Sequence, residues 1–517
     1  MSLSFRESLG RPGQFTLTYE LVPGQGSGSR QVERLLAFVL RAQADGRIKA
    51  LSITDNAGGH PSLAPSSIGA DVQALGLEPL VHFSLKDKNR NQIESHIFFY
   101  HRQGFHSLLV MGGDYPGRGY HGQAKPVFDL DSVQTLQLFH DLEQGQYRSG
   151  SSIQQELSAL SFFRGCVVSP FKIGQAEQLW QYGKLLRKIR AGAQFIVTQL
   201  GYDLRKFDEL LRFLRQAGIE TPVLANVFIP NLTVARLMSR GQVPGIVFPP
   251  ALLRAMEDEA QAGRANEARL QRASMMIATL RSMGYAGVHL GGNGLDFDKV
   301  ARVMDMAEAM HGNWRDLGRE AHFPVPGTFY LYEDDPAGGN GPQPRPLRPP
   351  SGPGPAWYFN HALHGLLFEE DNPCGRGLGR LCRHAYGRPR LTRLLILLEL
   401  LSKVPLFGCH LCGDCTLSES AYLCPQSGCP KRLVNGPCGG SREGRCEVHP
   451  ERPCFWVRVY ECGRRPADAA ELGQAPSLPP KDWSLSRGSS WINFFTGRDH
   501  RKKLINSNLG KDLSNML

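Results

Sequence analysis

The chain has 517 residues, of which 41% are hydrophobic and 21% charged, and its formal net charge is +11. This composition is typical of a soluble globular protein that is too long for one ordinary domain. The longest apolar run, Leu394 to Leu401, is interrupted by Glu399 and is far shorter than the roughly 20 residues of a membrane-spanning helix.

The positive charge indicates anionic partners, such as nucleotide cofactors. The basic residues are scattered along the chain and form no stripe interleaved with aromatic residues, so we do not expect nucleic-acid binding. The N-terminal segment contains Arg6, Glu7 and Arg11 and has no apolar stretch of the kind found in signal peptides. We therefore expect a cytoplasmic protein without a membrane span.

Short β-branched runs alternate with longer amphipathic stretches over the first 310 residues. The eight candidate strands are residues 15–21, 48–54, 79–85, 106–112, 164–170, 193–199, 222–228 and 286–292. Strands that alternate with helices predict a mostly parallel sheet. Eight such units match the usual size of a (β/α)8 TIM barrel, an α/β fold. An open doubly wound sheet is the alternative, but no G-x-G-x-x-G follows a strand.

Four regions follow from the composition. We expect the barrel over residues 1–315 and a linker over 316–356, because residues 335–355 are rich in proline and glycine. A smaller cysteine-rich metal-binding domain is expected over 357–464, with a strong helix near 390–403. The basic tail, 465–517, is expected to be mostly flexible, with aromatic residues that could dock: Trp483, Trp491, Phe494 and Phe495.

Polar side chains stand at or just beyond the ends of most predicted strands. They are Glu20, Thr54, His82, Asp114, Gln199, Asn226 and His289. Each alone is unremarkable, since strands commonly end in polar residues. Together they predict a polar ring at the carboxyl ends of the strands, where barrel enzymes have their active sites.

Several motifs around these residues resemble those of flavin-dependent methylenetetrahydrofolate reductases. They are TYELVP around Glu20, SITDNAGG around Thr54, VHFSLKDKNRN from Val81, GGDYP around Asp114 and LLRKIRAGAQFIVTQLGYD from Leu185. The resemblance runs in order over about 310 residues. It implies that the barrel binds flavin and folate and reduces 5,10-methylenetetrahydrofolate to 5-methyltetrahydrofolate.

The resemblance also implies roles for single residues. Glu20 matches the catalytic acid, and burial beside a flavin should raise the pKa of its carboxyl. Asp114 matches a catalytic carboxylate near flavin and pterin, and Gln199 matches the amide that binds the pterin. Flavin-contacting positions are matched by Thr54, His82, Asp114 and Lys188. Structural alternatives are an Asx turn at Asp114, a loop-bonded carboxylate at Glu20, a satisfied barrel histidine at His82 and a solvated charge at Lys188.

The sequence also departs from the family pattern. Gly112 stands where an Arg-Gly-Asp motif has its arginine, residues 21–24 replace Phe-Phe-Pro-Pro, and Ala225-Asn226 replaces Pro-Gly. The flavin is therefore expected to be FAD or FMN. The electron donor is expected to be NAD(P)H or reduced ferredoxin, and the reaction could run in either direction.

Eleven of the twelve cysteines lie between Cys374 and Cys462, which indicates metal ligation in a reducing compartment. Cys409, Cys412 and Cys415 form a C-x-x-C-x-x-C run, and Cys424 precedes a proline. This spacing favours an iron–sulfur cluster, with zinc as the alternative. Nine cysteines would supply two four-ligand sites with one left over: Cys409, Cys412, Cys415, Cys424, Cys429, Cys438, Cys446, Cys454 and Cys462.

This cysteine-rich segment resembles the C-terminal region fused to, or partnered with, some microbial reductases of this family. That resemblance implies a protein electron donor, and a homo-oligomer is a further expectation. Two other functions stay open. The barrel could hold methyltetrahydrofolate as the partner of a methyltransferase, or the chain could be a non-catalytic electron-transfer scaffold.

Overall fold

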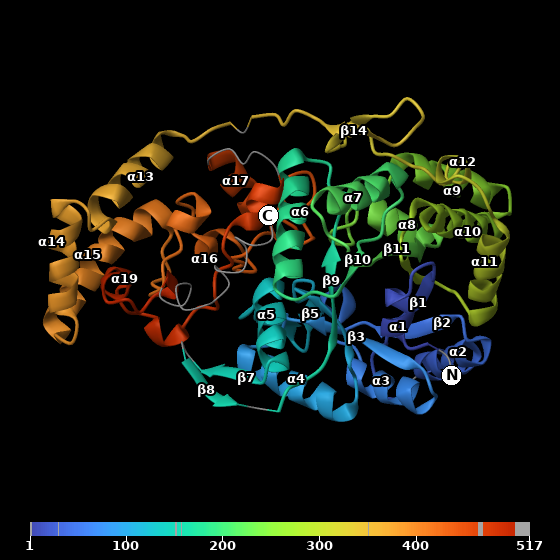
Figure 1. Cartoon of the computed structure of the whole chain (residues 1–517), viewed down its shortest axis with the longest axis horizontal. Coiled ribbons are helices and arrows are strands. Elements are labelled where there is room, and N and C mark those ends of the chain that lie inside the picture. The colour runs from blue at the N-terminus through green and yellow to red at the C-terminus, as the bar shows by residue number, and fades with distance from the viewer. Residues whose placement is uncertain are drawn as a thin grey trace.

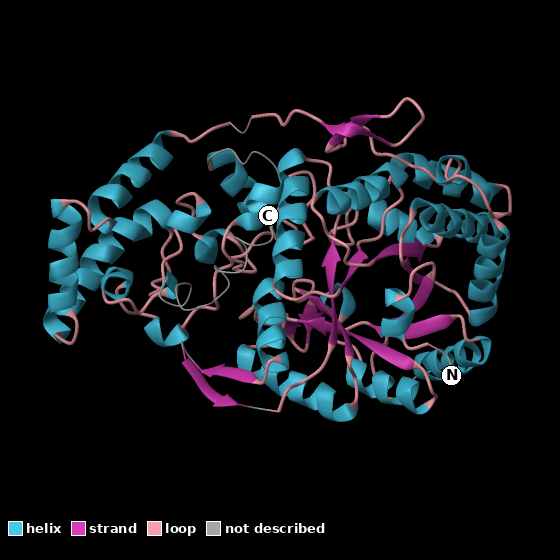
Figure 2. Ribbon diagram, in the orientation of Figure 1, coloured by secondary structure: helices cyan, strands magenta, loops and turns pink. Residues whose placement is uncertain are grey.

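The computed structural model describes residues 3–28, 30–149, 152–156, 158–349, 351–463 and 469–501. Eight parallel strands form a closed barrel, and each strand pairs with the next in chain order until the last returns to the first (Figures 1 and 2). The barrel strands are β1 (Thr16–Leu21), β2 (Ile48–Ile53), β3 (Glu78–Ser84), β4 (Ser107–Met111), β9 (Phe163–Val168), β10 (Phe195–Thr198), β11 (Val223–Ile229) and β12 (Gly287–Gly292).

All eight strands lie within two residues of the ranges expected from the sequence. The (β/α)8 barrel is therefore confirmed, and the open doubly wound alternative is wrong because β1 pairs with both β2 and β12. The strands are apolar on both faces, since the outer face packs against helices and the inner face fills the barrel.

Helices surround the barrel on its outer side (Figure 2). They are α2 (Arg30–Asp45), α3 (Pro65–Ala74), α4 (Arg90–Gln103), α5 (Ser132–Glu143), α6 (Gln175–Arg190), α7 (Leu204–Gln216), α8 (Leu232–Ser239), α9 (Pro250–Gln261), α10 (Ala265–Met283), α11 (Phe297–Ala309) and α12 (Trp314–Leu317). Side-chain caps begin several of them. Asp131 forms a capping box with Gln134 at α5, and Asp203 accepts from two backbone amides at α7.

A short N-terminal helix, α1 (Phe5–Gly10), closes the amino end of the barrel. The Phe5 ring packs edge-on against Phe163 and Phe195, with ring centroids 5.5 and 5.3 Å away. Leu80 and Leu109 belong to the same apolar cluster inside the barrel. The half of the barrel nearest the amino ends of its strands is therefore a packed apolar core. The polar ring expected from the sequence lies toward the carboxyl ends of the strands.

Three hairpins project from the loops: β5 (Arg118–Gly119) with β6 (Gly122–Gln123), β7 (Gln146–Ser149) with β8 (Ser152–Glu156), and β13 (Tyr332–Asp334) with β14 (Asn340–Pro344). The last hairpin lies partly within the proline- and glycine-rich stretch that we expected to be a linker. Gly338 and Gly339 adopt positive φ values in its turn, and Asn340 donates to Asp208 of α7 at 2.9 Å. The structure therefore differs from the expected linker over these residues.

The second region begins with three helices and continues into the cysteine-rich segment. Its elements are α13 (Pro355–Phe368), α14 (Pro373–Ala385), α15 (Pro389–Phe407), η2 (Ser418–Ser420), α16 (Pro425–Gly428) and α17 (Phe455–Cys462). In Figure 1, α13, α14 and α15 lie at the end of the molecule farthest from the barrel, and α5 and α6 lie between the barrel and the cysteine-rich segment. No helix in the described residues is both long and apolar enough to cross a membrane.

The tail was expected to be mostly flexible, but residues 469–501 pack against the rest of the chain. They form α18 (Ala469–Gln474), η3 (Trp483–Leu485) and α19 (Ser490–Phe495). Ile492 and Phe495 share a buried cluster with Leu395 of α15. The aromatic residues of the tail supply this apolar contact, which offsets the entropy of ordering the segment. Residues 502–517 lie outside the described residues.

Candidate functional site

The alternation of side chains along parallel strands places a set of polar groups inside the barrel mouth. Thr18 and Glu20 of β1 share one face of the strand, because side chains two residues apart point the same way. His289 of β12 is the register partner of Thr18, and Ser52 of β2 is the partner of Glu20. The pairing of β1 with β12 brings Thr18 beside His289, although the two residues are 271 positions apart in the sequence.

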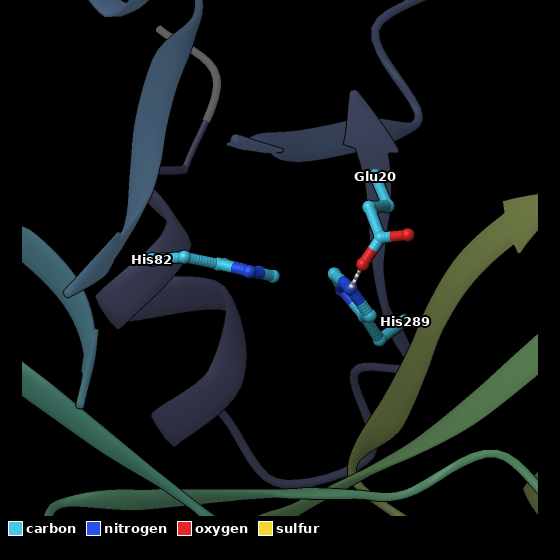
Figure 3. Close-up of side chains that lie close together, drawn as sticks. All are labelled: Glu20, His82 and His289. Carbon is cyan, nitrogen blue, oxygen red and sulfur yellow. Dashed lines mark ion pairs between the residues drawn. The ribbon is translucent and has the colours of Figure 1, made fainter. Parts of the chain in front are cut away.

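Glu20, His82 and His289 converge at this level (Figure 3). One ligand atom of each lies within 4.8 Å of the others. The nearest pair is His289 Nε2 and Glu20 Oε2, at 3.7 Å. Two imidazoles and a carboxylate would also suit a divalent transition-metal ion. Of the three, His289 was expected only as a member of the polar ring, and its contact with Glu20 was not foreseen.

Hydroxyl groups hold both imidazoles in place. Thr18 Oγ1 lies 2.8 Å from His289 Nδ1, and Ser52 Oγ lies 2.5 Å from His82 Nε2. The sequence analysis did not identify these two hydroxyls. The two-residue period of β1 and β2 would have pointed to them, since Thr18 precedes Glu20 and Ser52 precedes Thr54 on the same faces.

The electrostatics of Glu20 differ from expectation. Burial acts to raise the pKa of its carboxyl, but His289, 3.7 Å away, and to a smaller extent His82 favour the carboxylate and outweigh burial, so the pKa is lowered. We had expected a raised pKa from burial beside a flavin. The expectation failed for the ligand-free site because it left out the two imidazoles. Burial also lowers the pKa of His82 to about 4, so this imidazole is neutral near pH 7.

Asp114 lies in the loop after β4 and bonds across to the loop after β2. Its Oδ2 accepts from the backbone N–H of Gly58 at 2.8 Å, which is a contact between loops rather than a local Asx turn. Gly113 has a φ of +78°, and a Cβ there would lie 2.2 Å from Ser84 Oγ. Glycine is therefore required at this position to bring Asp114 over the mouth.

Gln199 and Lys188 are engaged with backbone groups. Gln199 Oε1 accepts from the N–H of Leu200 at 2.9 Å, and Lys188 Nζ donates to the carbonyl of Val167 at 2.6 Å. Burial lowers the pKa of Lys188, so it is not the solvated charge of the structural alternative. The structure thus brings Glu20 and His82 together, places Asp114 on the neighbouring loop, and leaves Lys188 between α6 and β9.

Several buried polar atoms at the rim have no hydrogen-bond partner among the described residues. Four of them belong to residues in the alternating positions that point into the barrel. They are Thr54 Oγ1 after β2, Ser84 Oγ in β3, Ser169 Oγ after β9 and Asn293 Oδ1 after β12. Buried polar groups are usually hydrogen-bonded, so this set indicates a ligand rich in donors and acceptors. Only Thr54 was expected. The two-residue alternation of side chains along each strand would have predicted that the other three also point into the barrel.

The cysteines form two groups. Cys409, Cys412, Cys415 and Cys424 line one cavity together with Lys403 and Phe407 of α15. Lys481 from the tail donates to Cys412 Sγ at 3.3 Å and also lines this cavity. We call these four residues the first cysteine set.

We call Cys429, Cys438, Cys446 and Cys454, which follow the first set along the chain, the second cysteine set. Cys462 is the ninth cysteine and stands at the C-terminal end of α17. We expected two four-ligand groups with one cysteine left over, and the choice of Cys462 as the remaining cysteine stays a prediction. Sequence spacing alone could not identify the odd residue.

Buried lysines join the second cysteine set to the barrel. Lys172 donates to the carbonyls of Gly439 and Ser441, and Lys184 donates to those of Gly436 and Pro437. Burial lowers the pKa of both ammonium groups.

Lys431 joins the same set to the loop that carries Asp114. It forms an ion pair with Glu447 and donates to the Gly113 carbonyl at 2.9 Å. A lysine from the cysteine-rich segment thus reaches the loop in which Gly112 replaces the expected arginine.

Comparisons with known proteins agree with this two-part arrangement. Residues 5–292 match a family model described as Methylenetetrahydrofolate reductase, and residues 389–484 match one described as Methylene-tetrahydrofolate reductase C terminal. Methylenetetrahydrofolate reductase 1 of Schizosaccharomyces pombe is 24% identical over 239 residues, which are 45% of this chain and 36% of that protein. The chain thus matches only part of this relative's length.

Two solved structures resemble the barrel distantly. One is a Clostridium thermocellum protein described as binding two copies of 5-methyl-5,6,7,8-tetrahydrofolic acid, with 11% identity, a TM-score of 0.38, and coverage of 57% of this chain and 93% of that one. The other is 2,3-dimethylmalate lyase, with 11% identity, a TM-score of 0.32, and coverage of 59% and 83%. At these scores neither bears on function.

Proposed function

Because the chain belongs to the methylenetetrahydrofolate reductase family, we propose that it reduces 5,10-methylenetetrahydrofolate to 5-methyltetrahydrofolate with a bound flavin. The observation that carries this proposal is the carboxyl group of Glu20, which lies beside His289 in the mouth of a barrel whose sequence matches the family. The reaction adds two electrons and two protons to the substrate. It therefore needs a hydride source and an acid.

The residues at the rim fit a flavin. The unpaired hydroxyls of Thr54, Ser84 and Ser169 offer hydrogen bonds to the polar edge of such a ring. Thr54, His82 and Asp114 would hold the cofactor. A phosphate contact by Lys188, as the family resemblance implies, would require its ammonium group to leave the carbonyl of Val167. A bound flavin, FAD or FMN, would supply the hydride. Lys431 adds a positive charge beside the Asp114 loop, where the family arginine is replaced by Gly112.

Glu20 would donate the proton that opens the five-membered ring of the substrate. Its carboxyl is ionised in the ligand-free site, so substrate binding must be accompanied by uptake of a proton. His289 is the group beside this carboxyl, and its other ring nitrogen is held by Thr18. Asp114 would stabilise the cationic intermediate by its negative charge, and Gln199 would bind the pterin.

The two cysteine sets are proposed to hold iron–sulfur clusters, with zinc as the alternative. The C-x-x-C-x-x-C run suits a cluster, and hydrogen bonds to ligand sulfur, such as that from Lys481 to Cys412, are a means by which proteins tune cluster potentials. The buried lysines around the second set would offset the negative charge of four thiolates. Clusters held by these cysteines would supply one-electron transfer between a donor and the flavin.

An anaerobic absorption spectrum tests these proposals together. We expect flavin bands that bleach with dithionite and return when methylenetetrahydrofolate is added, on a broad iron–sulfur shoulder. Metal analysis for iron and zinc separates the two cysteine hypotheses. NAD(P)H and reduced ferredoxin are then compared as donors. A protein that stays colourless with added FAD and FMN would overturn the reductase proposal and favour a methyltransferase partner or a scaffold.

A further inference from the structure

The outer face of α15 is unusually apolar. Of the nineteen residues of this helix, all of them described, only Leu395 and Glu399 are buried. Six large apolar side chains are exposed, by 46% to 65%: Leu394, Leu397, Leu398, Leu401, Val404 and Leu406. Five of them, Leu394, Leu397, Leu398, Leu401 and Val404, recur at spacings of three and four residues, which places these five on one side of the helix. Contiguous apolar surface of this kind is typical of a binding face.

The opposite side of the same helix lines the cavity of the first cysteine set. Glu399, Lys403 and Phe407 contribute to that lining. Lys403 is fixed there by bonds to Glu399 and to Ser490 of α19, at 2.8 and 2.7 Å. A helix with its side chains is about 10–12 Å across. A molecule bound to the outer face of α15 would therefore be separated from the first cysteine set by a single helix.

The surface around this face is positively charged. Residues 373–407, which span α14 and α15, contain six exposed arginines: Arg376, Arg380, Arg383, Arg388, Arg390 and Arg393. Their only acidic residue is Glu399, which is buried. Arg383 pairs with Glu370 just outside the segment. The exposed leucines are thus bordered by cations for which this part of the chain supplies no acidic partner.

We propose that the α15 face, defined as the five apolar residues on that side together with Arg390 and Arg393, binds an acidic electron-carrier protein that reduces the first cysteine set. The proposal rests on the proposed function, because it assumes that the cysteines hold a redox cluster. Each reduced carrier gives up one electron and is itself oxidised. Two such electrons, with two protons from solvent, convert one methylene group of the folate into a methyl group.

Charge decides between this partner and a second copy of the chain. Two copies that met through their α15 faces would bring four arginines to the contact, Arg390 and Arg393 from each, and residues 373–407 of neither copy would offer an exposed carboxylate. Like charges at an interface oppose association, whereas an acidic partner meets both the arginines and the leucines. The proximity of the cysteine cavity gives a reason for that partner to be a redox protein.

The test uses the anaerobic holoprotein and a purified ferredoxin with two [4Fe–4S] clusters as the probe. The first variant is Arg390→Glu with Arg393→Glu, and the second is Leu397→Gln with Leu401→Gln. The matched control is Arg34→Glu with Leu40→Gln, which changes an exposed arginine and an exposed leucine on α2 at the opposite end of the molecule (Figure 1). Binding is measured by calorimetry, and electron transfer is measured by stopped-flow absorbance.

The arginine variant should slow reduction by ferredoxin by about 10- to 10³-fold, the range over which charge steering changes association rates. The leucine variant should also slow it, because apolar contact area is lost. Reduction by dithionite and the control variant should be unchanged. Unaltered ferredoxin binding and reduction in both α15 variants would overturn the proposal. So would a wild-type dimer that the leucine variant dissociates, or attachment of the face to anionic phospholipid vesicles. If ferredoxin bound to the α15 face but the protein contained no clusters, the docking site would be supported and the proposed redox role of the cysteines would be refuted.

Discussion

Replacement of Glu20 by glutamine tests the proposed chemistry most directly. Glutamine has nearly the size of glutamate, and its amide oxygen can still accept a hydrogen bond from His289. The side chain is 20% exposed, so no large buried volume is lost and the barrel should fold. The variant cannot donate the proton, however. A positioned general acid contributes about 10²- to 10⁴-fold to a rate, which corresponds to about 3–5 kcal/mol.

The two half-reactions separate this effect from a loss of cofactor. In anaerobic stopped-flow experiments, reduction of the Glu20→Gln flavin by the donor should change little, because no proton from Glu20 is needed. Reoxidation of the reduced flavin by methylenetetrahydrofolate should be about 10²- to 10⁴-fold slower than in the wild type. Reoxidation at the wild-type rate, with flavin bound, would refute the role given to Glu20.

A carboxylate at the opposite end of the barrel provides the matched control. Glu78 accepts from the Phe5 N–H at 2.9 Å and from Ser107 Oγ at 2.5 Å, near the amino ends of the strands. Glu78→Gln removes the same charge from the same barrel. It should lower thermal stability while it leaves both half-reactions unchanged.

Three further predictions concern pH, metal content and the contact between the two parts. The pKa of His82 is lowered mainly by burial, to about 4, from 6.5 in the unfolded chain, so stability is fully present above pH 6.5 and is lost as the pH falls toward 4. Urea unfolding across this range should show a weaker pH dependence for His82→Asn, and an equal dependence would contradict the assignment. Cys462→Ser should keep the full metal content by mass spectrometry, whereas Cys438→Ser should lose one of the two sites; the reverse pattern would show that the grouping is wrong. Lys431→Met should cost roughly 3–5 kcal/mol, because it leaves Glu447 charged and buried without its cation. Adding Glu447→Gln should restore most of the lost melting temperature, and no restoration would mean that the ion pair is not the cause.

Much of the barrel could be predicted from the sequence. Strand and helix periods are local signals, and the eight apolar runs each carry enough β-branched residues to be located within two positions. Glu20, Thr54, His82 and Asp114 were identified because a parallel barrel places the ends of all its strands at one mouth. The cysteine spacing likewise indicated metal ligation from residues close together in the chain.

The tertiary structure decided the properties that depend on distant contacts. The direction of the Glu20 pKa shift follows from His289, which β12 brings beside β1, and His289 is held by Thr18, 271 residues away. Lys431 meets Gly113 across 318 residues, so no local pattern could place it at the barrel mouth.

The same reasoning applies to the cysteines, the tail and the hairpin. Ligand grouping depends on how the loops between cysteines fold, and spacing left the choice of the odd residue open. Residues 469–501 pack against the second region because Ile492 and Phe495 meet an apolar surface on α14 and α15. Local sequence determined where strands, helices and reactive side chains stand along the chain. The pKa values, the burial and the hydrogen-bond partners of these side chains depend on the closed barrel and on the packing of the second region against it. Each of these properties is determined by neighbouring residues that lie far apart in the sequence.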